Sequence, residues 1–124
     1  MAKSKVKTSG IDHVVLHVTD LARSKAFYMQ VLGMTEHHGG DDWAFMRCGD
    51  QIVGLFEIDE GEEVALGYEL NHMALNVASG SNTEIKAHLK ANGVKVSGRR
   101  GDPDCIYFDD PDGHRLQIMP ADRG

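Results

Sequence analysis

Apolar and polar residues alternate along the first strand-like part of the chain and then recur at helical spacing. Val14, Leu16 and Val18 alternate with the residues between them, which is the period-2 pattern of a half-buried strand. Asp20 is a favourable helix N-cap, apolar residues recur at roughly helical spacing over 21–32, and Gly33 suits the left-handed position after a helix. Short strand-like stretches separated by turn residues follow, so this half predicts the order β-α-β-β-β, with the later strands at 35–38, 43–48 and 51–58.

The second half of the chain follows the same order. Residues 71–77 match residues 12–18, and Ser81 with Glu84 has the spacing of a capping box. Gly93 ends the predicted helix. The remaining strands are predicted at 94–97, 104–109 and 115–119, and a turn is predicted at 110–113 from the sequence Asp-Pro-Asp-Gly.

Equivalent residues in the two halves are separated by a nearly constant number of positions. The separation is 59 from His13 to His72 (72 − 13), 60 from Gly33 to Gly93 (93 − 33) and 60 from Glu57 to Gln117 (117 − 57). A duplicated unit is the simplest explanation, and tandem units pair because neither buries its apolar face alone.

The repeat predicts an α+β fold in which tandem βαβββ modules form a cupped mixed β-sheet with helices on its outer face. Module one spans 10–58, a polar linker spans 59–70 and module two spans 71–120, within one domain over 10–124. Residues 1–9 are basic but lack the apolar stretch of a signal peptide, so we predict a flexible tail.

Four polar residues at repeat-equivalent positions are candidate metal ligands: His13, Glu57, His72 and Gln117. Each alternates with apolar residues of its strand, and if those residues face the core, the four polar side chains face the other way. An approximate twofold between the modules would then bring them together. Two imidazoles, one carboxylate and one amide oxygen suit a divalent Ni, Co, Zn, Mn or Fe ion. With Glu57 ionised, the first shell would carry a charge of about +1, which stabilises a developing oxyanion.

Strand parity also selects residues that would line the pocket around such an ion. His17 shares the face of His13, and the second module contributes Asn76, Arg115 and Met119.

The remaining histidines and the large aromatic residues are predicted to lie outside the site. Adjacent His37 and His38 face opposite ways on a strand, His88 lies on a helix surface, and His114 forms a local hydrogen bond after the turn. The core or an interface is the predicted location of Trp43, Phe45 and Tyr107.

Composition restricts the class of protein. A chain of 124 residues that is 41% hydrophobic and 26% charged is typical of one soluble domain, and its net charge of −6 disfavours nucleic acid as a partner. No apolar run approaches the roughly 20 residues needed to span a bilayer, so no membrane partner is predicted. Cys48 and Cys105 lie in apolar segments and are predicted to be buried free thiols, which fits a cytoplasmic protein.

Several motifs resemble the vicinal oxygen chelate superfamily, which includes glyoxalase I, extradiol dioxygenases, methylmalonyl-CoA epimerase, fosfomycin-resistance transferases and bleomycin-resistance proteins. In the first module they are the segments at 10–13, 20–24, 27–28 and 31–34; in the second they are 71–75 and 108–116. The resemblance covers roughly residues 10 to 120. It implies that His13, Glu57 and His72 match ligand positions of the family, and that Gln117 stands where most metal-binding members carry a glutamate.

The glutamine bears on the reaction that the resemblance implies. The resemblance implies that extradiol dioxygenases and fosfomycin transferases bind their metal with two histidines and one carboxylate. That carboxylate stands at the position of Gln117 in this chain, so both functions are disfavoured. The expected function is therefore that of a metal-dependent lyase or isomerase that abstracts a proton next to a carbonyl of a small substrate, as lactoylglutathione lyase does. Glu57 is then the candidate catalytic base, while His17 and Gly61 replace glutathione-binding residues of bacterial glyoxalases.

Two other functions are compatible with the sequence. One is a non-catalytic small-molecule or antibiotic-binding protein of the bleomycin-resistance type, and the other is an iron-dependent extradiol-type dioxygenase. In each case the partner is a small molecule and the assembly is a homodimer, with the cup formed either within one chain or between two.

Overall fold

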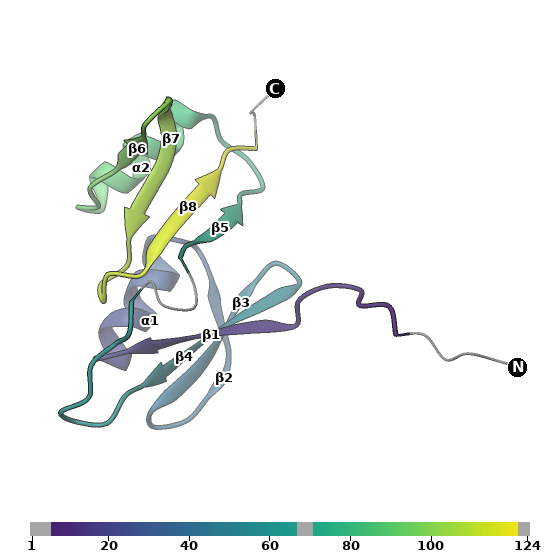
Figure 1. The fold of residues 1–124 in the computed structure, drawn as a ribbon, viewed down its shortest axis with the longest axis vertical. Helices are drawn as coiled ribbons and strands as arrows, with labels where there is room; N and C mark the ends of the chain where they lie inside the picture. Colours follow the sequence, from purple (N-terminus) through teal and green to yellow (C-terminus); the bar gives the residue numbers. More distant parts are fainter. Residues whose placement is uncertain (1–5, 67–70, 122–124) are drawn as a thin grey trace, which may run out of the picture.

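The computed structural model describes residues 6–66 and 71–121 and contains the predicted βαβββ plan twice (Figure 1). The predicted tail and linker lie partly outside the described residues, at 1–5 and 67–70. Module one consists of β1 (His13–Val18), α1 (Leu21–Gln30), β2 (Thr35–Gly39), β3 (Trp43–Cys48) and β4 (Gln51–Glu57). Module two consists of β5 (Met73–Asn76), α2 (Asn82–Ala91), β6 (Ser97–Arg99), β7 (Asp102–Asp109) and β8 (Arg115–Met119).

Each module forms its own four-stranded mixed sheet. The strand orders are β1-β4-β3-β2 and β5-β8-β7-β6, with one parallel pair in each sheet, β1 with β4 and β5 with β8. The α+β class and the repeat are thereby confirmed. The predicted strand at 94–97 is displaced to β6, because Val94 and Val96 pack against the core before the chain pairs with β7 from Ser97 onward.

Both helices begin at the predicted caps. The Asp20 side chain accepts a hydrogen bond from the amide of Arg23 at 3.1 Å, and Ser81 with Glu84 forms the complete capping box. Gly33 follows α1 with a φ of 70°, which a residue without a Cβ adopts at little cost. No helix of the described part of the chain is long and apolar enough to cross a membrane.

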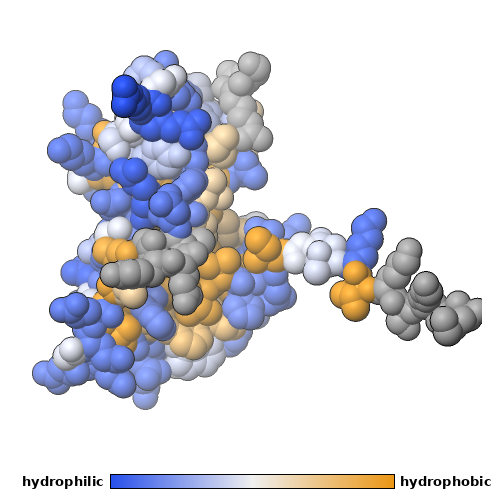
Figure 2. Space-filling model, viewed as in Figure 1, coloured by the Kyte–Doolittle hydropathy of each residue, from blue (hydrophilic) through white to orange (hydrophobic). Residues whose placement is uncertain are grey.

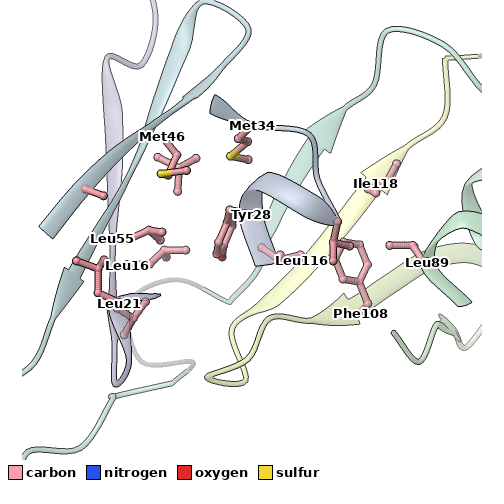
Figure 3. Close-up of a cluster of buried hydrophobic side chains, with 14 of the residues drawn as sticks. Leu16, Leu21, Tyr28, Met34, Met46, Leu55, Leu89, Phe108, Leu116 and Ile118 are labelled. Atoms are coloured by element: carbon pink, nitrogen blue, oxygen red, sulfur yellow. The ribbon is translucent and has the colours of Figure 1, made fainter. Parts of the chain in front are cut away.

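One hydrophobic core lies between the two sheets. Leu16 and Leu55 reach it from the first sheet and Leu116 from the second, and Tyr28 of α1 lies between the two groups (Figure 3). The modules therefore pack with their helix-bearing sides together. In a single chain the sheets do not join into one cup, and their other faces point outward.

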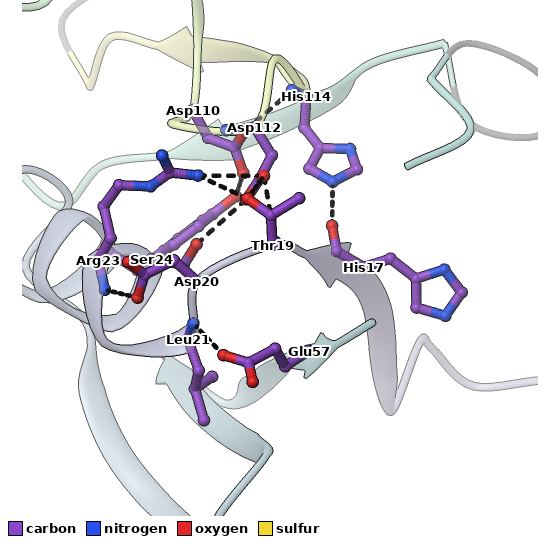
Figure 4. Close-up of polar contacts among 11 residues, drawn as sticks. His17, Thr19, Asp20, Leu21, Arg23, Ser24, Glu57, Asp110, Asp112 and His114 are labelled. Carbon is purple, nitrogen blue, oxygen red and sulfur yellow. Dashed lines mark hydrogen bonds and ion pairs between the residues drawn. The ribbon is translucent and has the colours of Figure 1, made fainter. Parts of the chain in front are cut away.

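Polar contacts around the turn at 110–113 also join the modules (Figure 4). Asp112 accepts hydrogen bonds from the amide and hydroxyl of Thr19 and pairs with Arg23 at 3.1 Å. Asp110 is buried and accepts a 2.8 Å hydrogen bond from the Tyr28 hydroxyl. Burial and the neighbouring Asp110 carboxylate raise the pKa of Tyr28 far above its ordinary value, so this hydroxyl stays protonated and acts as the donor.

Two histidines expected to be peripheral also bridge the modules. The ring of His88 hydrogen-bonds the carbonyl oxygen of Val31 at 2.8 Å, and the ring of His114 bonds that of His17 at 2.7 Å. His88 is exposed on α2 as predicted, and the amide of His114 forms the predicted local hydrogen bond, with Oδ1 of Asp110. Both rings also reach module one, because α2 and the turn pack directly against it. Cys105 is buried and Cys48 half-buried, and both are free thiols as predicted.

Candidate functional site

His13 and His72 have the same local environment in the two modules. His13 opens β1 and His72 directly precedes β5. The Nδ1 atom of His13 lies 2.7 Å from Oδ2 of Asp12, and that of His72 lies 3.0 Å from Oδ1 of Asn71. Both acceptors favour the tautomer that donates from Nδ1, which leaves the lone pair on Nε2. A metal-binding histidine has this arrangement, because the second hydrogen bond fixes the ring and raises the basicity of the ligating nitrogen.

Gln117 lies on the same face of the second sheet as His72. Ala74 pairs with Gln117, and His72 is two residues before Ala74, so their side chains share that face. The Gln117 side-chain amide donates to the Cys105 sulfur at 3.1 Å, which leaves its Oε1 atom as a possible metal ligand. A cavity of about 190 Å³ is lined by Gln117, Cys105 and Met119, among other residues.

Glu57 is on the opposite face of its sheet from His13. Glu57 pairs with Val18, a core residue, whereas His13 pairs with Ile52. The face predicted for Glu57 is therefore wrong. The prediction assigned Phe56 to the core, but the core side of β4 carries Val53 and Leu55, and Phe56 is exposed.

The Glu57 carboxylate instead serves the first helix. Its Oε2 atom accepts a hydrogen bond of 2.8 Å from the amide of Leu21, the first residue of α1 (Figure 4). Free amides and the helix dipole make this end favourable for a negative charge.

The two outward faces carry the other predicted pocket residues. We define face A as the side of the first sheet that bears His13, and face B as the side of the second sheet that bears His72 and Gln117. Strand parity places His17 on face A, and places on face B the predicted residues Asn76, Arg115 and Met119. Within residues 6–66 and 71–121, no group of three or more His, Cys, Asp or Glu side chains is close enough to hold a metal ion. One chain alone thus does not assemble the predicted ligands.

The aromatic residues that were predicted to lie in the core or at an interface are on these two faces, and Tyr107 is buried there. Tyr107 contacts the edge of the His72 ring at a centroid distance of 5.5 Å, and the Arg115 guanidinium lies 5.0 Å above the Tyr107 ring. On face A, the His13 ring lies 5.3 Å from the ring of Phe45. Phe45 and Tyr107 alternate along β3 and β7 with the core residues Met46 and Ile106. Strand alternation therefore predicts that they face away from the core.

A family model described as the Glyoxalase/Bleomycin resistance protein/Dioxygenase superfamily matches residues 10–118. Among curated proteins, glutathione transferase FosA of Serratia marcescens is 32% identical over 111 residues, covering 87% of this chain and 78% of the relative. Metallothiol transferase FosB of Staphylococcus epidermidis is 28% identical over 113 residues, covering 88% and 81%.

Solved structures show the same fold. The fosfomycin resistance protein FosX from Listeria monocytogenes, in a monoclinic form, superposes with a TM-score of 0.75 at 26% identity, covering 91% of this chain and 92% of that one. Lactoylglutathione lyase from Agrobacterium tumefaciens superposes with a TM-score of 0.73 over 93% and 96% of the two chains, at 22% identity.

Proposed function

Because the chain belongs to the glyoxalase/bleomycin resistance/dioxygenase superfamily, we propose that it is a metal-dependent enzyme whose site is shared between two copies of the chain. The observation that carries this proposal is the matched pair of histidines. In both modules an imidazole faces away from the core and has its Nδ1 atom held by the preceding side chain.

The direction of the two faces supports a shared site. The core lies between the sheets, so face A and face B of one chain point away from each other. A second copy related by a twofold axis brings face A of one protomer to face B of its partner, and the same operation creates two equivalent sites. Each site would combine His13 of one protomer with His72 and Gln117 of the other.

The proposed ligands fit a divalent transition metal. Two imidazole nitrogens and one amide oxygen are suitable donors for Zn, Ni, Co, Mn or Fe, and three protein ligands leave positions for substrate oxygens. Since Glu57 lies on the other side of its sheet, the proposed set is neutral. A bound divalent ion would keep its full charge and act as a strong Lewis acid toward a substrate oxygen.

This arrangement favours addition to a small electrophile over proton abstraction by Glu57. FosA is named a glutathione transferase, FosB a metallothiol transferase and FosX a fosfomycin resistance protein, and all three are similar to this chain over most of its length. We propose that the residues of the shared site orient a small oxygen-bearing substrate for attack by a thiol or by water. The preference for a lyase that followed from Gln117 is thus reversed, because its candidate base is bonded to α1.

A lyase or isomerase of the predicted kind is the second candidate. Its support is the position of His17, which lies on face A two strand positions from Val15 and four from His13. This imidazole of β1 could accept a proton from a bound substrate in place of Glu57.

Metal titration tests the proposal. Dialysed protein is titrated with Zn²⁺, Ni²⁺ and Mn²⁺ by calorimetry, and the same titrations are made with His13→Ala and His72→Ala. We expect each variant to lose at least about 100-fold in affinity, since loss of a supporting hydrogen bond alone costs 10- to 100-fold. The matched control is His37→Ala, an exposed histidine of β2.

The reaction is tested with the metal-loaded protein, fosfomycin and either glutathione, another low-molecular-weight thiol or water, followed by mass spectrometry. Adduct formation that requires the metal supports the transferase or hydrolase. Metal binding without turnover of fosfomycin or of a hemithioacetal favours a binding protein, and wild-type affinity in both histidine variants excludes the site.

A further inference from the structure

Face A has an apolar surface of aromatic rings that begins at His13. We define the aromatic wall as Trp43, Phe45 and Phe56. The His13 ring lies at 5.3 Å from Phe45 with an interplanar angle of 32°, and Phe45 stacks on Phe56 at 5.9 Å and 28°. Trp43 contacts both phenylalanines, at 5.5 and 6.2 Å. The wall thus extends continuously from the proposed metal ligand across β3 and β4.

Two glycines leave room for these rings next to the backbone. A Cβ at Gly54 would approach the Phe45 ring and the Val15 side chain to 3.0 Å, and one at Gly40 would approach the Trp43 indole to 2.4 Å. Gly54 occupies the centre of the wall, between β1 and β3. Because Gly54 has no side chain, the Phe45 ring and the Val15 side chain can approach the backbone of β4 at this position.

The wall is accessible in the single chain. Phe56 is 36% exposed and Val15, beside it on the same face, is 40% exposed. Apolar surface gathers over the sheet of module one in Figure 2. Trp43 and Phe45 are half-buried, and a contiguous apolar surface of this kind marks a site that binds a ligand or a partner.

We propose that the substrate or ligand of this site has a planar aromatic group that packs on the wall while its oxygen atoms reach the metal. The metal contact rests on the proposed function above, whereas the wall does not. A small aliphatic phosphonate would bind beside His13 and leave the rings uncovered. An aromatic group attached to the metal-binding oxygens would cover Phe45 and Phe56, and ring pairs of this kind prefer the offset or edge contacts that the wall presents.

Phenylphosphonate and methylphosphonate form a matched pair of probes, because both offer the same oxygen atoms and only one has a ring. Binding is followed through Trp43, the single tryptophan of the chain, whose fluorescence reports directly on the wall. We expect Zn²⁺-loaded protein to bind phenylphosphonate about tenfold more tightly, with a change in Trp43 emission, and methylphosphonate to leave the emission unchanged.

Variants separate the wall from the metal. Phe56→Leu keeps an apolar side chain but removes the ring, so it should abolish most of the preference for phenylphosphonate while metal affinity stays at the wild-type value. The control is Met29→Ala, an exposed apolar residue of α1.

The outcomes distinguish this proposal from the proposed function. Equal affinity for the two probes, or no binding of either probe with or without metal, would show that the aromatic wall does not bind an aromatic group. If the metal titration is nevertheless as proposed, the shared metal site is still supported. If Phe56→Leu changes the dissociation constant of the dimer and not the probe preference, a second copy covers the wall and the proposal is wrong.

Discussion

Asp12 and Asn71 hold equivalent positions before the two candidate histidines, and each accepts from Nδ1 of the following ring. If the histidines bind a metal, these residues position them without touching the ion. Asp12→Ala should then lower metal affinity about 10- to 100-fold, and Asp12→Asn, which copies the Asn71 arrangement, should lose less. A competition titration against a chromophoric chelator measures both. Asp41→Ala, at an exposed loop position, is the control, and an equal loss there would show only an effect of surface charge.

Asp110 makes the stability of the chain depend on pH. Burial raises the pKa of this carboxyl above its usual 3.8, even though hydrogen bonds from Tyr28 and from the amides of His114 and Asp112 act in the other direction. The protonated form is therefore more favoured in the folded chain than in the unfolded chain. Its contribution to the free energy of unfolding is greatest below the unfolded pKa and decreases as pH rises through the raised pKa of the folded state.

The isosteric change Asp110→Asn removes this titration. We expect the free energy of unfolding of the variant to increase relative to that of the natural chain as pH rises from near 3.8 through the raised pKa. Urea denaturation at several pH values measures this difference. Asp109→Asn, on the exposed neighbouring position of β7, is the control. A difference between Asp110→Asn and the natural chain that is independent of pH would contradict the assignment.

At the scale of strands and helices, local patterns were sufficient where one face of an element is clearly apolar. The bounds of β3 and β8 match the predicted ranges, and both N-caps were identified because a cap depends only on residues within one turn. Strand parity failed at the end of β4. The residues Leu55, Phe56 and Ile58 are all apolar, so the sequence does not determine which of them faces the core, and the wrong choice placed Glu57 beside His13.

Glu57 gives a direct test of that correction. Its carboxylate caps the first amide of α1, so Glu57→Ala should lower the free energy of unfolding by about 1 kcal/mol, as for other lost helix caps. Metal affinity should remain at the value of the unmodified chain. Urea denaturation and calorimetry measure the two quantities, with Glu60→Ala in the exposed turn after β4 as the control. A large loss of metal affinity would restore Glu57 as a ligand.

For the whole molecule, the decisive feature is that α1 and the core lie between the two sheets. The repeat predicted that the modules pair, but the apolar faces that pair are the helix-bearing ones, and the sequence contains no local signal that distinguishes pairing within a chain from pairing between chains. The outward position of face A and face B follows only from the assembled core. It is the reason that the proposed site combines ligands from two copies.

A shared site predicts complementation between two inactive variants. His13→Ala retains face B and His72→Ala retains face A, so a mixed dimer contains one intact site and one site that lacks both histidines. Random pairing on co-expression makes about half of the dimers mixed, and metal bound should recover to about a quarter of the sites. Metal content after purification through two different affinity tags, which selects mixed dimers, should rise to about half of the sites. A site formed within one chain would give no recovery in either preparation, because every chain would then lack one of its histidines.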